Sequence, residues 1–156
     1  MAEKTREARE ASLRAATEGD LAAIEQLLTS TGLPTAGVAD ALRDFIVAES
    51  EDDNRVVGVV GLELCGEEYA LLRSAAVEPE WRGTGLGRRL VTHVIADAES
   101  RGIKALYLLT TTAERYFPSF GFVPTRRDVV PDAIKQSVEF REACPASATV
   151  MALDLG

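Results

Sequence analysis

The sequence predicts a single α/β (α+β) domain, built on one mixed and mostly antiparallel β-sheet flanked by helices. Three observations carry this prediction. Short apolar and β-branched runs up to residue 77 are joined by tight turns, as in an antiparallel meander. An amphipathic helical pattern then covers 85–100. A compact apolar strand follows at 105–109, and a crossover helix would make it parallel to the strand before the helix.

In the first half of the chain, Thr17 is placed to cap a helix whose apolar residues follow at helical spacing. Gly32-Leu33-Pro34 ends that helix, and a shorter one is expected at 36–42. The glycine-dotted, β-branched run at 55–64 indicates a buried strand with close backbone neighbours. The strands expected in this half lie at 12–16, 45–48, 55–64 and 69–77.

In the second half, the helix at 85–100 places Leu86, Leu90 and Val94 on one face and ends at Arg101-Gly102. Short helices are expected at 113–120 and 131–137. The remaining strands are expected at 105–109, from 121 onward, and at 149–153.

The bulk properties fit one globular domain of 156 residues, with a flexible segment at 1–10 and the folded domain at 11–156. No apolar run approaches the ~20 residues of a membrane span, and the charged N-terminus does not resemble a signal peptide, so we expect a cytoplasmic protein. The net charge of −8 argues against a nucleic-acid surface. Cys65, Cys144 and the single His lack metal-ligand spacing, so no metal site is expected.

The turn Arg82-Gly83-Thr84-Gly85-Leu86-Gly87-Arg88-Arg89 stands between a predicted strand and the long helix. Its glycines let the backbone approach a ligand closely, and the free N–H groups of the helix favour an anion such as phosphate. Arg82, Arg88 and Arg89 would add local positive charge. The spacing differs from the dinucleotide fingerprint, and the Gly-Lys of a phosphate loop is missing. On the glycines alone, a tight connection without a ligand stays an alternative.

Residues 77–87 resemble the cofactor motif of the GNAT superfamily of N-acetyltransferases, in which Arg82, Gly85 and Gly87 fill the required places. A second landmark follows at Ala113, Phe117 and Gly121-Phe122. The resemblance covers nearly the whole chain and identifies 11–156 as an N-acetyltransferase domain. It implies a split sheet and acetyl-CoA as cosubstrate, with no metal.

The resemblance also implies how the cofactor would bind. Amides from 83 to 88 would cradle the pyrophosphate, and the backbone at 75–77 would pair with the pantetheine arm like an added strand. An amide there could stabilise the oxyanion formed when an amine attacks the thioester. The expected cofactor-binding residues are Ala75, Ala76, Val77, Arg82, Gly83, Thr84, Gly85, Leu86, Gly87, Arg88, Thr110 and Phe117.

The chain departs from the family at Phe117, where many members carry a tyrosine that protonates the leaving thiolate. Tyr116 lies one step earlier, roughly 100° away on a helix, and is not expected to take that role. A thiol with a pKa near 8.5 leaves without a dedicated acid.

Residues 71–74, 108–117 and 144–151 resemble the arsenic-resistance N-acetyltransferase branch, and 108–117 also resembles the acetyltransferase domain of N-acetylglutamate synthases. The resemblance implies transfer of acetyl to the amine of a small amino-acid-like acceptor, linked to arsenic resistance. A stand-alone glutamate N-acetyltransferase and a non-catalytic CoA-binding regulatory module are the alternatives.

Two charged residues are the candidates for catalysis. Glu63, on the strand beside 69–77, could take the proton of the amine, or be an exposed strand-end carboxylate. Arg73 interrupts an apolar strand and could clamp a substrate carboxylate or oxyanion, or form a structural ion pair. Thr110 could line the pocket or cap the next helix. No role is assigned to Cys144, and an open sheet edge near the C-terminal strand favours a homodimer.

Overall fold

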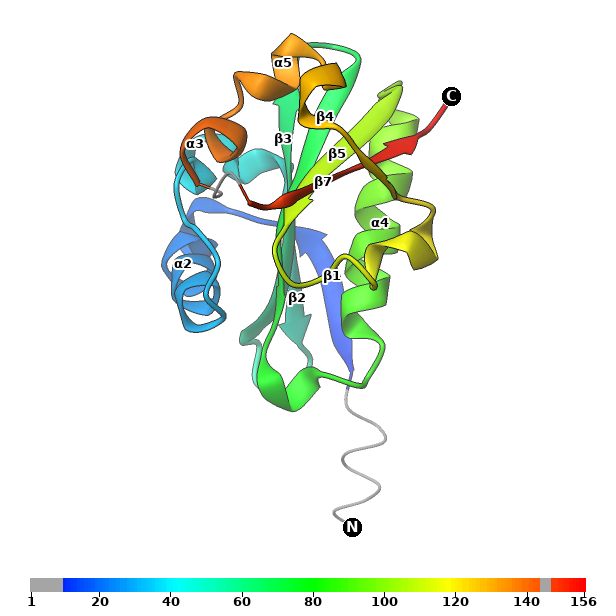
Figure 1. Ribbon diagram of the computed structural model, residues 1–156. Coiled ribbons are helices and arrows are strands. Elements are labelled where there is room, and N and C mark those ends of the chain that lie inside the picture. Colours follow the sequence, from blue (N-terminus) through cyan, green and yellow to red (C-terminus); the bar gives the residue numbers. More distant parts are fainter. Residues whose placement is uncertain (1–9, 144–146) are drawn as a thin grey trace.

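The structure is a computed structural model that describes residues 10–143 and 147–156 (Figure 1). The expected flexible segment at 1–10 lies outside the described residues except for its last member, and so does Cys144. Among the described residues, no helix is long and apolar enough to cross a membrane, and no group of His, Cys, Asp and Glu could hold a metal ion.

A seven-stranded sheet forms the centre of the molecule, in the order β1-β2-β3-β4-β5-β7-β6. Neighbouring strands are antiparallel except β4 and β5, which run parallel on either side of a crossover helix. This confirms the predicted mixed and mostly antiparallel sheet. The strands are β1 (Ala11–Ala15), β2 (Phe45–Ser50), β3 (Val56–Cys65), β4 (Tyr69–Val77), β5 (Ala105–Thr110), β6 (Val123–Thr125) and β7 (Thr149–Asp154).

Helices cover both faces of the sheet (Figure 1). The crossover helix α4 (Leu86–Ser100) packs Leu90 and Val94 in one buried cluster with Leu62 of β3. On the other face, Ile24 of α2 (Leu21–Ser30) packs in a cluster with Phe45. The shorter helical segments are α3 (Val38–Ala41), α5 (Asp132–Lys135), the 3₁₀ turns η1 (Glu18–Asp20), η2 (Leu42–Asp44), η3 (Pro79–Trp81), η4 (Phe117–Phe120) and η5 (Arg127–Val129), and the π-helical turn η6 (Glu139–Ala143).

Asp20 ties the start of α2 to β1. Its carboxylate accepts a hydrogen bond from the amide of Thr17 at 2.8 Å and two from the Arg14 guanidinium at 2.7 and 2.9 Å. Thr17 therefore marks the start of this helical region, as predicted, but the first turn is the 3₁₀ segment η1 rather than α-helix.

The predicted close backbone approach along β3 is confirmed at Gly61. A Cβ placed there would lie 2.3 Å from the ring of Phe45, so only glycine fits beneath that ring.

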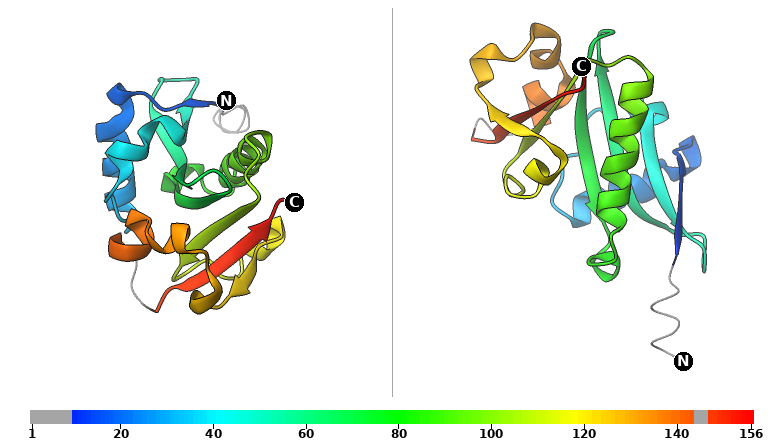
Figure 2. Two further views of the ribbon diagram at one scale, coloured as in Figure 1. Left: turned by 90° about the horizontal axis from the view of Figure 1, so that it is seen from above. Right: turned by 90° about the vertical axis from the view of Figure 1, so that its right-hand side faces the viewer.

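The sheet splits between β4 and β5. These strands pair only where Tyr69 to Leu71 lie opposite Ala105 to Tyr107, and β4 continues to Val77 without pairing on that side. The last part of the chain, coloured yellow to red, gathers on one side of the split with β5 (Figure 2). The split expected from the family resemblance is therefore present.

One detail of the sequence prediction is wrong. Residues 113–120 were expected to form a helix, but only Phe117–Phe120 is 3₁₀ helical and the preceding residues form a turn. Pro118 explains this, because it lacks the N–H that a continuous helix would bond to the carbonyl four residues earlier, and its ring crowds that carbonyl. The C-terminal strand β7 lies between β5 and β6, so the sheet edge is the three-residue β6, blunted by Pro124.

Candidate active site

The glycine turn leads directly into α4. Gly83 and Gly85 adopt left-handed conformations with φ of 80° and 87°, and a Cβ at either position would meet nothing within 4 Å. The hydroxyl of Thr84 donates to the carbonyl of Trp81 at 2.5 Å and braces the turn from within. The turn thus exposes its backbone on an open side.

That open side is polarised for an anion. The amides of Gly83, Gly85, Gly87 and Arg88 have no hydrogen-bond acceptor among the described residues, and the N-terminal end of the α4 dipole adds positive potential. A hollow over this end of α4 is lined by the turn and by Val77, Trp81, Leu86 and Tyr116. Arg82 and Arg88 line it as well, whereas Arg89 is turned away and donates to the carbonyl of Ala11.

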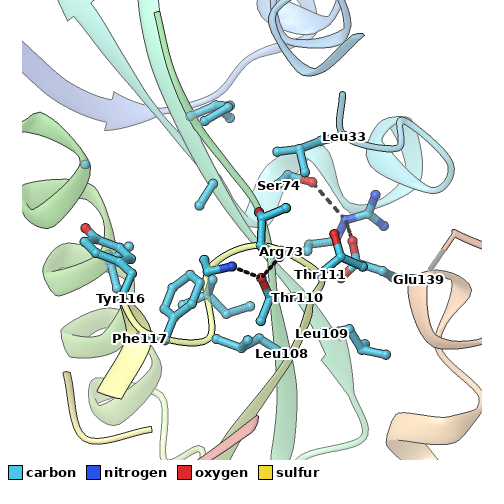
Figure 3. A pocket seen from close by; sticks show the side chains of 18 of the residues that line it. Leu33, Arg73, Ser74, Leu108, Leu109, Thr110, Thr111, Tyr116, Phe117 and Glu139 are labelled. Carbon is cyan, nitrogen blue, oxygen red and sulfur yellow. Dashed lines mark hydrogen bonds and ion pairs between the residues drawn. The ribbon is translucent and has the colours of Figure 1, made fainter. Parts of the chain in front are cut away.

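A larger cavity of about 380 Å³ opens where β4 and β5 separate (Figure 3). Its walls include the unpaired backbone at Ala75, Ala76 and Val77, the end of β5, and the loop after α2 at Leu33. Val77, Gly87 and Tyr116 line both hollows. The phosphate-type turn and the cavity are therefore joined, as a long cofactor with a pyrophosphate at one end would require.

A β-bulge in β4 shapes the middle of this cavity. Between Val59 and Gly61 of β3 the partners in β4 move from Ala76 to Arg73, so β4 carries one extra residue. Ser74 within the bulge has φ of 63°, a left-handed conformation that is rare outside glycine.

Arg73 is the charged centre of the cavity wall. Its side chain is 0% exposed, and its Nη1 lies 3.3 Å from Oε1 of Glu63. Its Nε donates to the Ser74 hydroxyl at 3.0 Å and lies 3.7 Å from Oε1 of Glu139 (Figure 3). The Nη2 atom is buried without a hydrogen-bond partner among the described residues. A buried guanidinium donor without a partner is costly unless a ligand satisfies it.

Glu63 lies beside this centre rather than on the cavity. Its Oε2 accepts a hydrogen bond from the amide of Val138 at 2.7 Å, while Oε1 faces Arg73. The side chain is 15% exposed, so it is not the exposed strand-end carboxylate that was the alternative. Among the residues that the structure describes, Glu63 does not line the cavity.

Glu139 is a carboxylate of the wall that sequence reasoning missed. It is 4% exposed, lines the cavity, and comes from η6 near the end of the chain. Burial raises the pKa of Glu139 to about 7, partly offset by the positive charge of Arg73 and reinforced by the negative charge of Glu63. The sequence signal that could have revealed it is a single acid between apolar neighbours, Val138 and Phe140.

Tyr116 is the second residue whose position the sequence did not indicate. It lines both hollows, and its ring contacts Phe117 and Phe120 edge-on. Burial raises the pKa of the Tyr116 hydroxyl, so the group is protonated at neutral pH. The predicted direction of the Tyr116 ring assumed a helix at 113–120, and the structure has a turn at this residue.

Most of the predicted cofactor residues share this channel. Thr110 lines the cavity, and its hydroxyl also accepts hydrogen bonds from the amides of Thr112 and Ala113 at 3.3 and 2.9 Å, which brace the turn found in place of the expected helix. Phe117 is buried on the cavity wall, and Thr84 is the predicted member that lines neither hollow. The members on one or both hollows are Ala75, Ala76, Val77, Arg82, Gly83, Gly85, Leu86, Gly87, Arg88, Thr110 and Phe117.

Comparison with known proteins identifies the family. The sequence profile of the Acetyltransferase (GNAT) domain matches residues 41–124, more than half of the chain. The chain belongs to the GNAT acetyltransferase family. The matched range contains the glycine turn, the split strands and the start of β6, so it includes most of the elements that line the two hollows.

Named relatives of this GNAT domain are longer proteins. The amino-acid acetyltransferase of Escherichia coli K12 is 29% identical over 105 residues, which is 67% of this chain and 23% of that protein. The amino-acid acetyltransferase of Ralstonia nicotianae is 45% identical over 56 residues, 36% of this chain and 12% of that one. The match therefore spans about a quarter or less of these relatives' length.

Solved structures share the GNAT fold. N-acetylglutamate synthase from Neisseria gonorrhoeae, complexed with coenzyme A and N-acetyl-glutamate, superposes with a TM-score of 0.78 at 23% identity, covering 94% of this chain and 35% of that one. A Mycobacterium tuberculosis protein in complex with CoA gives a TM-score of 0.78 at 23% identity, covering 92% and 98%.

These findings confirm the predicted superfamily and fold class, and with them the class of enzyme, an acetyl-CoA-dependent acetyltransferase domain. The arsenic-resistance branch, the homodimer and the cytoplasmic location stay predictions.

Proposed function

We propose that the protein transfers the acetyl group of acetyl-CoA to the amine of a small, amino-acid-like acceptor by direct attack on the thioester. The observation that carries this proposal is the unsatisfied Nη2 of Arg73, buried in the wall of a cavity that opens onto the split between β4 and β5. A planar guanidinium in this position suits a carboxylate, which accepts its parallel N–H bonds.

The cofactor would lie along the channel that joins the two hollows. The free amides at the start of α4 would hold the pyrophosphate, with Arg82 and Arg88 beside it. The unpaired edge of β4 at Ala75–Val77 would pair with the pantetheine arm, and an amide in this stretch would stabilise the oxyanion of the tetrahedral intermediate. The thioester would then lie close to the bulge that presents Arg73.

The names of the relatives support an amino acid as acceptor, and glutamate is one specific candidate. An arsenical amino acid is the other, supported by the sequence resemblance of 71–74, 108–117 and 144–151 to arsenic-resistance enzymes. Both carry the amine and the acidic group that Arg73 would hold. The C-terminal part of that resemblance includes 144–146, outside the described residues.

A non-catalytic CoA-binding module is the second candidate, favoured by Phe117. This residue occupies the place of the usual tyrosine acid and is 7% exposed on the cavity wall. A module of this kind would bind acetyl-CoA and release no thiol.

The test is thiol release from acetyl-CoA with the twenty L-amino acids and arsenical amino acids, alongside calorimetric binding of acetyl-CoA. Turnover with at least one panel member is expected. Arg73→Lys, which keeps the charge but loses the fork, should raise the acceptor KM about 10-fold or more and leave the acetyl-CoA KM unchanged. Binding of acetyl-CoA without any turnover would favour the module, and absence of binding would exclude both candidates.

A further inference from the structure

The carboxylate of Glu139 faces the same cavity as Arg73 and has no part in the cofactor channel. It is 4% exposed and comes from η6, a segment beyond the matched family range. Its ion-pair partner among the described residues is Nε of Arg73 at 3.7 Å, which is too long for a hydrogen bond. Its oxygens therefore keep the capacity to accept a hydrogen bond from a ligand.

Both carboxylate oxygens of Glu63, by comparison, already have partners in the protein. One oxygen accepts the amide of Val138 at 2.7 Å and the other faces Nη1 of Arg73 at 3.3 Å. Because it does not line the cavity, it is poorly placed to meet an acceptor amine. It instead fixes Arg73 and connects β3 to the amide next to Glu139.

The wall of the cavity thus presents two complementary groups side by side. Nη2 of Arg73 is a cationic donor without a partner, and Glu139 is an acidic acceptor next to it. A free amino acid carries the matching pair, a carboxylate and an ammonium group on one carbon. An amine without a carboxylate would leave Nη2 unsatisfied.

We propose that Arg73 and Glu139 together select zwitterionic amino acids, and that Glu139 is the base that frees the acceptor amine. This inference rests on the proposed acetyl transfer. In the first step the ammonium group gives one proton to the Glu139 carboxylate and becomes a neutral amine with a lone pair.

The neutral nitrogen then attacks the thioester carbonyl, and the C–N bond forms. The tetrahedral intermediate collapses as the C–S bond breaks, and the thiolate leaves on CoA. The second proton of the nitrogen passes to the thiolate, and Glu139 returns its own proton to solvent. One acetyl group is transferred, and no oxidant or metal takes part in the balance.

As the base for the acceptor amine, Glu139 must titrate near neutral pH, since a base is most effective when its pKa lies near the working pH. The charged groups acting on Glu139 among the described residues are Arg73 of β4 and Glu63 of β3. A rate profile with an acid limb near pH 7 would report this carboxylate in the free enzyme.

The experiment compares wild type, Glu139→Gln and the matched control Glu63→Gln, which removes the other acidic neighbour of Arg73. Thiol release is measured against pH with L-amino acids and with their primary amides, which lack the carboxylate. Wild type should react faster with the free amino acids than with their amides, and its rate should fall as the pH drops below about 7. Glu139→Gln should lose about 10²-fold or more in kcat at pH 7, lack that limb, and recover as the pH rises and solution amine becomes neutral.

Glu63→Gln should keep the limb, moved to lower pH because the charge of Glu63 no longer raises the pKa of Glu139, and should mainly raise the acceptor KM. Both variants should bind acetyl-CoA like wild type. If Glu139→Gln keeps the limb and its kcat lies within about 3-fold of wild type, or if amides react as well as acids, the inference is overturned while the proposed function stands. If wild type releases no thiol with any panel member, both fall together.

Discussion

Nε of Arg73 donates a hydrogen bond to the hydroxyl of Ser74, 3.0 Å away, although the two residues are neighbours in one strand. Side chains of consecutive strand residues normally point to opposite faces. The bulge in β4 and the positive φ of Ser74 bring them to the same side.

Ser74→Ala should lower the free energy of unfolding by about 1–3 kcal/mol, because it removes a hydrogen bond to a buried charge and keeps the left-handed strain. Ser74→Gly loses the same hydrogen bond but relieves the strain, so it should be the more stable of the two. Urea unfolding measures both. Equal stability of the two variants would show that the bulge is not strained at Ser74.

A substitution at Gly87, near the start of α4, should affect cofactor binding and stability differently. A Cβ there would meet only Tyr116 and Val77, at 3.6 and 3.7 Å, so Gly87→Ala should fold with unchanged or slightly higher stability. The methyl group would nevertheless project toward the hollows that Gly87 lines, and acetyl-CoA should bind about 10-fold or more weakly. Calorimetry and thermal unfolding measure the two effects.

Gly102→Ala is the matched control for Gly87→Ala. Gly102 ends α4 with φ of 81° in open space, so alanine there should cost about 1 kcal/mol of stability and leave acetyl-CoA binding unchanged. Weakened binding in this control would mean that Gly87→Ala acts through the helix rather than at the cofactor.

Gly61→Ala tests the packing between β2 and β3. Its methyl group would lie 2.3 Å from the ring of the fully buried Phe45, so the ring or a strand must move. We expect a loss of about 1–3 kcal/mol in chemical denaturation. Phe45→Leu in the same chain should recover part of the loss, and failure of this second change to help would locate the strain elsewhere.

Glu139 makes stability depend on pH in a direction opposite to that of most acids. Its pKa is raised from 4.5 in the unfolded chain to about 7 in the folded protein, so folding favours its protonated form. Its contribution is complete below pH 4.5 and is lost as the pH rises toward 7, by up to about 3 kcal/mol. The stability of wild type relative to Glu139→Gln should therefore fall over this interval in urea titrations. A difference that does not vary with pH would contradict it.

Asp20 affects the pH dependence of stability in the direction that is usual for a carboxylate. The hydrogen bonds from Arg14 lower its pKa from 3.8 to about 2, so its stabilising effect is present above pH 3.8 and is lost as the pH falls toward 2. Asp20→Asn should cost about 2 kcal/mol at pH 7, and the gap from wild type should narrow at pH 3. A gap of constant size would assign the loss to the Thr17 hydrogen bond instead.

The glycine-turn end of the channel could be predicted from the sequence because its geometry is local. The left-handed glycines, the helix start and Arg82 belong to one short stretch, and the positive φ values at Gly83 and Gly85 follow from residue type. Arg73 could also be found, since a lone charge in an apolar strand needs a partner.

The Glu139 side of the cavity could not be placed this way. The segment that carries Glu139 is held beside β3 by the hydrogen bond from the amide of Val138 to Glu63, a contact between residues 75 positions apart that no local pattern encodes. The position of Tyr116 on both hollows was missed for a different reason, because a turn stands where a helix was expected and Pro118 removes a hydrogen bond that such a helix needs.

The cavity at the split between β4 and β5 is built from two separate parts of the chain. The glycine turn and both split strands lie within the range that matches the GNAT family, 41–124, while Glu139 comes from a later stretch held to β3 by Glu63. Exchange of the stretch that carries Glu139 would change the cavity wall beside Arg73 and leave the residues of the glycine turn unchanged. Under the proposed function, the residues that hold the donor and those that meet the acceptor are therefore separate in the sequence, so the acceptor could be changed by substitutions in 126–143 alone.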